Sequence, residues 1–156
     1  MAINVQQSVM LPLIVFDAEA MRIVSDDCSA DLLVIATVGS LTYENQPHGE
    51  STLATLLVDR AIVGPTPWPL QVRYRGGRTT FVSDQPTLRR GHRYLLAFRI
   101  PADRPLPYLV SWDEAPADID LPDAETLHSA WDTMCAAGPV YGVSIDALRG
   151  TLAGSQ

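Results

Sequence analysis

The sequence predicts a mainly β domain, an OB-like antiparallel barrel of five to six strands with one helix before it and two helices after it. Three observations support this prediction. Apolar and polar residues alternate with period 2 in the segment 70–100. Glycine and proline divide the chain into short segments, and two amphipathic patterns follow near the C-terminal end. A two-sheet β-sandwich is the alternative, because the same strand spacing suits it.

The length of 156 residues fits one domain, with the barrel at about 30–112 and an acidic linker with a helical C-terminal segment at about 113–156. Hydrophobic residues make up 47% of the chain and charged residues 19%, a globular composition. No apolar run approaches the roughly 20 residues of a membrane helix. The apolar N-terminal run has no preceding positive charge, so we expect no secretory signal, and a cytoplasmic location by default.

The strands are predicted from the alternation of side chains and from the turn residues between the runs. The first covers residues 32–43, with Gly39 as a candidate bulge, and the second covers 51–63. In the third, Leu70, Val72 and Tyr74 share one face, and Gly76-Gly77 is predicted to turn the chain into a further strand. The last two strands are predicted at 93–100 and 108–112, and 113–122 has too few apolar residues to continue them.

Three segments have the pattern of helices. Residues 17–24 are predicted to form a short helix capped by Asp17. Residues 123–135 follow with Asp123 as N-cap and an apolar stripe, and Gly138-Pro139 ends this helix. A final short helix is predicted after Ser144, with its apolar residues facing inward. The inward residues of these last two helices are Leu127, Trp131, Met134 and Cys135, and then Ile145, Leu148 and Leu152.

Several stretches together resemble a known type of module. They are SADLLVIATV at 29–38, LATLLVDRAIVG at 53–64, VRYRGGR at 72–78, the pattern P-x-L-x-x-G-x-R-Y-L-L-A-F at 86–98, and SIDALRGTL at 144–152. The chain resembles the OB-type barrel of uncharacterised bacterial extracytoplasmic proteins, which is similar to the netrin-type module of metalloproteinase inhibitors. The resemblance covers about residues 18–112 and a further part at 143–152.

This resemblance implies an OB-type fold and an extracytoplasmic location, and it implies no particular activity. The inhibitors depend on an N-terminal Cys-x-Cys, and this chain has no cysteine before Cys28, so inhibition is not expected here. Cys28 and Cys135 have no CxxC spacing. Without a leader we expect two reduced, buried thiols, and in an oxidising compartment one disulfide joining the segment before the first strand to the C-terminal helix.

The charges are unevenly distributed along the chain. Residues 1–59 hold eight acids and one arginine, 73–104 hold eight arginines and two acids, and 113–146 hold eight acids and no base. Lysine is absent, and the net charge is −7, which argues against general binding of nucleic acids or acidic membranes. The candidate partner-binding residues are Arg73, Arg75, Arg78, Arg89, Arg90 and Arg93, together with Trp68.

Like charges side by side on a strand are unfavourable unless a partner compensates them. The partner can be the acidic segment 113–123 of the same chain, the acidic surface of a neighbouring subunit, or a single-stranded nucleic acid. Nucleic acid is disfavoured because Tyr74, Tyr94 and Phe98 alternate inward, away from the arginines. A solvated arginine face with local ion pairs is the further alternative. Trp68 lies among prolines, and we expect it to plug an open barrel end, or otherwise to anchor a partner.

The sequence shows no pattern of catalytic or metal-binding residues. The three histidines stand apart, no Gly-x-Ser-x-Gly elbow is present, and the acids at 118–123 lack the glycine and distal glutamate of a calcium loop. We therefore expect no cofactor and no metal. The sequence favours a non-enzymatic structural or protein-interaction domain in a homo-oligomer or larger assembly. An exported OB-type binding module, a single-stranded nucleic-acid binder using the arginines, and a hydrolase with an unrecognised site are the alternatives.

Overall fold

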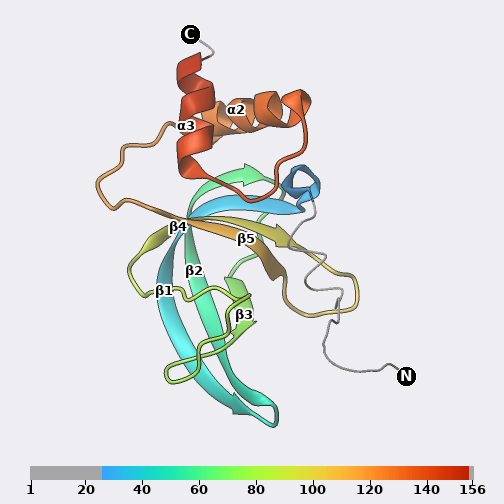
Figure 1. Cartoon of the computed structure of the whole chain (residues 1–156), viewed down its shortest axis with the longest axis vertical. Helices are drawn as coiled ribbons and strands as arrows, with labels where there is room; N and C mark the ends of the chain where they lie inside the picture. The colour runs from blue at the N-terminus through green and yellow to red at the C-terminus, as the bar shows by residue number, and fades with distance from the viewer. Residues whose placement is uncertain (1–25, 155–156) are drawn as a thin grey trace, which may run out of the picture.

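The structure is a computed structural model and describes residues 26–154. The described chain is mainly β, with five antiparallel strands in one sheet, a 3-10 turn before them and two α-helices after them (Figure 1). The predicted helix at 17–24 lies outside the described residues. The elements in chain order are η2 (Asp27–Ser29), β1 (Leu32–Gln46), β2 (Gly49–Val63), β3 (Leu70–Arg75), β4 (Arg93–Arg99), β5 (Tyr108–Ala115), α2 (Ala124–Ala137) and α3 (Ile145–Gly154).

The strand order in the sheet is β3-β2-β1-β4-β5, so β3 and β5 are its edges. The sheet curls until Cα atoms of β3 and β5 come within 8 Å of each other, but no ladder joins these strands within the described part of the chain. The prediction of a closed barrel is therefore not confirmed. The alternative prediction, a two-sheet sandwich, is not confirmed either, because the five strands form a single sheet. Part of the reason lies at the end of β3, where the side-chain Oε1 of Gln85 accepts the Arg75 N–H at 3.1 Å in place of a strand partner.

The two longest strands bend at bulges. The pairing of β1 with β2 shifts register three times, and the last shift falls between Val38 and Ser40, on either side of Gly39. The bulge predicted at Gly39 is therefore confirmed. Glycine suits this position because it has no side chain. A Cβ there would lie 3.2 Å from Cγ of Leu57, which is a close contact. The bulges let one strand contribute to two differently oriented parts of the sheet.

The first half of β1 and most of β4 are buried on both faces, because apolar residues cover each side. One cluster lies between the sheet and the helices, and the other lies inside the curl of the sheet. This double burial explains the continuous apolar runs at 32–36 and 94–98. The helix-side cluster includes Leu33, Ile35, Leu95, Ala97, Leu127, Trp131 and Leu148, and the inner cluster includes Leu32, Val34, Leu56, Leu70, Tyr74, Tyr94, Leu96 and Phe98.

The two helices lie together at the end of the molecule opposite the tip of the β1–β2 hairpin (Figure 1). Oδ1 of Asp123 accepts the Thr126 N–H at 2.8 Å, and Gly138 ends α2, so both predicted ends of this helix are confirmed. At the start of α3, the Ser144 hydroxyl oxygen accepts the Ala147 N–H at 3.2 Å, and Asp113 accepts the Ile145 N–H at 2.8 Å. The second bond fixes α3 to β5.

Two strand predictions near the edges are wrong. Residues 76–92 form a loop, and Gly76-Gly77 does not lead into a strand. Gly76 has φ +98°, its carbonyl accepts the Thr52 hydroxyl at 2.8 Å, and Gly77 N–H closes a turn onto the carbonyl of Thr80. These bonds turn the chain away from the edge of β3. The other difference is at β5, which continues through Asp113 to Ala115 because Ala115 is buried in the helix-side cluster.

Candidate binding groove between the edge strands

A groove with a volume of about 360 Å³ lies between the two edge strands, and we call it the β3–β5 groove. Arg73, Tyr74 and Arg75 of β3 line one side, and Tyr108 and Trp112 of β5 line the other. The β1–β2 hairpin, the 76–92 loop and the β4–β5 loop complete it through Gln46, His48, Ser51, Asp84, Gln85 and Arg104. The size of the groove is typical of binding sites, and its lining combines aromatic rings with many polar and charged side chains.

Positive charge dominates the groove, with three arginines against the single carboxylate of Asp84 among its lining residues. Nε of Arg73 donates to Oε1 of Glu44 at 2.9 Å, and 43% of the Arg73 side chain is exposed. The guanidinium carbon of Arg104 lies 5.5 Å from the centre of the Tyr108 ring, within cation–π range. Both guanidiniums therefore have a preferred position at the groove while part of each stays open to solvent.

Buried tyrosines hold the loop that forms one wall of the groove. The Tyr74 hydroxyl accepts the Leu88 N–H at 3.3 Å, and the Tyr94 hydroxyl accepts the Arg89 N–H at 2.9 Å. Burial raises the pKa of both phenols above the usual value, against the opposing effect of these hydrogen bonds. The hydroxyls stay protonated near neutral pH and keep the loop attached to the inner cluster.

The predicted arginines do not form one cluster. Arg73 and Arg75 lie at the groove, whereas the Arg78 guanidinium stacks 4.8 Å from the centre of the Tyr43 ring, outside the residues that line it. Arg89 and Arg90 are exposed on the turn before β4. Four residues of the groove were not predicted as candidates, namely His48, Arg104, Tyr108 and Trp112. Arg104 lies inside the arginine-rich segment 73–104, and that signal could have identified it.

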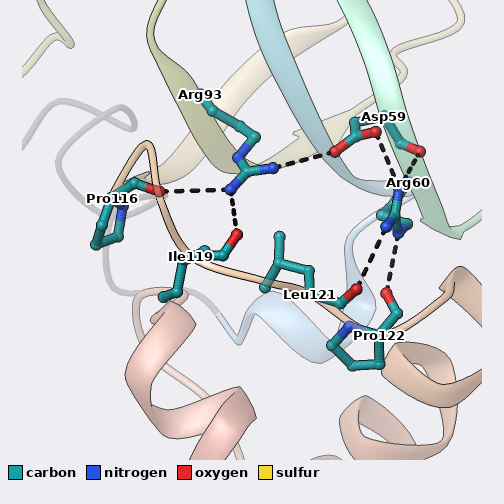
Figure 2. A network of polar contacts seen from close by, with 7 residues as sticks. All are labelled: Asp59, Arg60, Arg93, Pro116, Ile119, Leu121 and Pro122. Atoms are coloured by element: carbon teal, nitrogen blue, oxygen red, sulfur yellow. Dashed lines mark hydrogen bonds and ion pairs between the residues drawn. The ribbon is translucent and has the colours of Figure 1, made fainter.

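Arg93, another of the predicted arginines, bonds the sheet to the linker between β5 and α2, as Figure 2 shows. Its Nη2 atom donates to the carbonyls of Ile119 at 2.8 Å and Pro116 at 3.4 Å, and its Nη1 atom donates to Asp59 at 3.4 Å. Arg60 bonds the carbonyls of Pro122 and Leu121 in the same way. The acidic linker is thus attached to the sheet through its main-chain carbonyls, while Asp118 and Asp120 remain exposed.

Trp68 is 85% exposed, so the expectation that it plugs a barrel end is wrong. The reason is that Leu32, Leu70 and Phe98 already fill the inner cluster. Trp68 is not among the residues that line the groove. Its exposure is consistent with the other expectation, an anchor for a partner, which the structure does not test.

The two cysteines form a disulfide, with Cα atoms 5.8 Å apart, so the expectation of reduced thiols is wrong. The bond joins η2 to α2, as expected for an oxidising compartment. Next to it, Asp27 is buried, and Oδ2 of Asp27 accepts the Gly142 N–H at 2.9 Å. Burial raises the pKa of the Asp27 carboxyl, against hydrogen bonds from Gly142 and Ser111. The disulfide thus holds the start of the described chain to α2, and hydrogen bonds hold it to the segment between the helices.

Within residues 26–154, no group of three or more His, Cys, Asp or Glu side chains is placed to hold a metal ion. The described helices include none long and apolar enough to span a membrane. No family model and no curated protein matches this sequence.

Proposed function

We propose that this chain is a non-enzymatic protein-interaction domain that works within a homo-oligomer or larger assembly, with the β3–β5 groove as its contact site. The observation that carries the proposal is the joint lining of the groove by Arg73, Arg104, Tyr108 and Trp112. Arginine, tyrosine and tryptophan are enriched among the residues that contribute most to binding energy at protein interfaces. The groove therefore has the composition of an interface core, in contrast to a solvated charged face.

The charge of the rest of the chain supports association between copies. The net charge is −7, while the groove contains three arginines. An acidic surface of one copy and the groove of another are thus electrostatically complementary, and such complementarity accelerates association and orients the partners. The Cys28–Cys135 disulfide fits an oxidising, extracytoplasmic setting for this assembly, since such bonds are rare in the cytosol.

Sedimentation velocity of the full chain tests the proposal. We expect association at about 0.01 M salt, where the Debye length is about 30 Å, and dissociation at about 1 M salt, where it is about 3 Å. Arg73→Gln combined with Arg104→Gln should weaken association. The matched control is Arg89→Gln with Arg90→Gln, which removes the same charge outside the groove. A chain that stays monomeric at the lower salt concentration, at every protein concentration, would contradict the proposal.

One observation favours a second candidate function, single-stranded nucleic-acid binding. The sequence predicts that Tyr74, Tyr94 and Phe98 face inward, and all three are buried. Tyr74 nevertheless lines the groove beside the arginines, together with Tyr108 and Trp112 of β5. Aromatic rings next to a basic groove are what single-strand binding requires. The acidic net charge opposes this candidate, because nucleic-acid binding domains are usually basic.

A further inference from the structure

We propose that the β3–β5 groove recognises an extended protein segment in which acidic and apolar residues alternate. This inference rests on the proposed function and specifies the partner's chemistry. Its basis is that the groove has two chemically different sides, and that the alternation of β3 produces them. Arg73 and Arg75 are exposed on one face of the strand, and Tyr74 between them is buried on the other.

The apolar side of the groove continues the inner cluster. Tyr74 belongs to that cluster, and Leu109 and Trp112 of β5 are half-buried against it. All three line the groove. An apolar side chain entering from outside would therefore extend an existing core and remove further apolar surface from water.

The basic side of the groove is suited to carboxylates. Guanidinium groups pair with carboxylates through parallel hydrogen bonds, and this geometry gives specificity as well as attraction. Arg73 already shows the preference in its bond to Glu44. That pair is exposed and contributes little, so a partner carboxylate can share or replace it without a large loss. Arg104, held over the Tyr108 ring on the opposite side, provides a second cation.

The spacing of the arginines determines the pattern of the partner. Arg73 and Arg75 are two residues apart on a strand, a rise of about 7 Å. An extended segment that lies along the groove has its own alternate side chains at the same spacing. Carboxylates at those positions meet the arginines, and the residue between them points toward Tyr74 and Trp112.

Fluorescence anisotropy with a short labelled peptide in which Glu and Val alternate tests this inference. A second peptide of the same composition, with all Glu residues before all Val residues, controls for charge alone. A labelled oligothymidylate of the same charge represents nucleic acid. For the full chain we expect the alternating peptide to bind at least about tenfold more tightly than the block peptide, as the loss of one charge-assisted hydrogen bond implies.

Variants locate the site. Arg73→Gln with Arg104→Gln should weaken binding of the alternating peptide about tenfold or more, whereas Arg89→Gln with Arg90→Gln should change it less than about twofold. Equal weakening in both variants would overturn the inference, because it would show attraction by net charge without a site. Equal binding of the two peptides, or no binding of either, would also overturn it while leaving the sedimentation test of self-association unaffected. Tighter binding of oligothymidylate than of the alternating peptide would overturn the inference and favour the nucleic-acid candidate.

Discussion

Cys28 in η2 and Cys135 in α2 form a disulfide between residues 107 positions apart in the sequence. Asp26 and Asp27 reinforce the same junction, because Oδ1 of Asp26 accepts the Val140 N–H at 2.9 Å and Oδ2 of Asp27 accepts the Gly142 N–H at 2.9 Å. The helices are therefore held to the sheet by a covalent bond at one end and by the Arg60 and Arg93 contacts to the linker at the other. The sheet and the helices form one unit.

Reduction of this disulfide should lower the free energy of unfolding by about 4 to 5 kcal/mol, the loss expected for a closed loop of roughly 100 residues. The measurement is urea unfolding with and without a reductant. Cys28→Ser with Cys135→Ser should show the lower stability under both conditions. A wild-type midpoint that does not change on full reduction would contradict the structural role of the bond.

Asp27 should make stability depend on pH in an unusual direction. Burial raises the pKa of its carboxyl, so the folded chain binds this proton more tightly than the unfolded chain. Its contribution to stability is complete below the usual carboxyl pKa and is lost as pH rises through the raised pKa. Asp27→Asn keeps a hydrogen-bond acceptor and cannot titrate. Its unfolding free energy minus that of the wild type should increase as pH rises through this window.

Urea unfolding at a series of pH values measures this difference. Asp26 titrates in the opposite sense, because N–H groups of Val140 and Cys28 lower the pKa of its carboxyl, and this residue is the same in both proteins. Asp118→Asn, which removes an exposed carboxylate on the linker, controls for the loss of one negative charge. A constant difference for Asp27→Asn would contradict the assigned effect of burial.

Arg93→Ala should lower the free energy of unfolding by about 2 to 3 kcal/mol, because it removes charge-assisted hydrogen bonds to the Ile119 and Pro116 carbonyls. Arg90→Ala, on the exposed turn before β4, should change it by less than about 0.5 kcal/mol. Hydrogen exchange then separates local from global effects. Amides of residues 117–121 should exchange faster in the Arg93 variant than in the Arg90 variant, and equal rates would be evidence against the attachment.

The strands and helices could be predicted because their side-chain periods are local. The caps of α2 and α3, the bulge at Gly39 and the alternation of Leu70–Arg75 all follow from neighbouring residues. The loop at 76–92 was mispredicted because the bond from the Thr52 hydroxyl to the Gly76 carbonyl connects residues 24 apart. Periodicity within a strand contains no information about such a contact.

The groove could be predicted only in part, because it also depends on contacts between residues far apart in the sequence. Arg73 and Arg75 follow from the alternation of one strand, but Arg104 and Trp112 reach them only because the sheet curls. Whether the edge strands pair or leave a groove depends on contacts such as that of Gln85 with Arg75. The disulfide likewise depends on the docking of η2 against the segment after α2.

Gly64→Ala should destabilise the fold by about 3 kcal/mol or more, through backbone strain and through a steric clash. The same substitution at Gly91 distinguishes the two effects. Gly64 has φ +81°, which costs a residue with a side chain about 1 kcal/mol or more, and a Cβ there would collide with the main-chain oxygen of Asp31. Gly91 has φ +83° with open space around it. Gly91→Ala should therefore show the conformational cost alone. Equal losses of stability in thermal unfolding would mean that the chain relaxes at Asp31.

Trp68→Ala should leave the free energy of unfolding within about 0.5 kcal/mol of the wild type, because the side chain is 85% exposed. Trp131→Ala is the matched comparison, since Trp131 is buried between α2 and the sheet, and it should cost about 3 to 5 kcal/mol. A large loss of unfolding free energy in Trp68→Ala would instead support the expectation that Trp68 plugs a barrel end. If Trp68 anchors a partner, its substitution should instead weaken self-association in sedimentation while leaving unfolding unchanged, because anchoring residues act only in the complex.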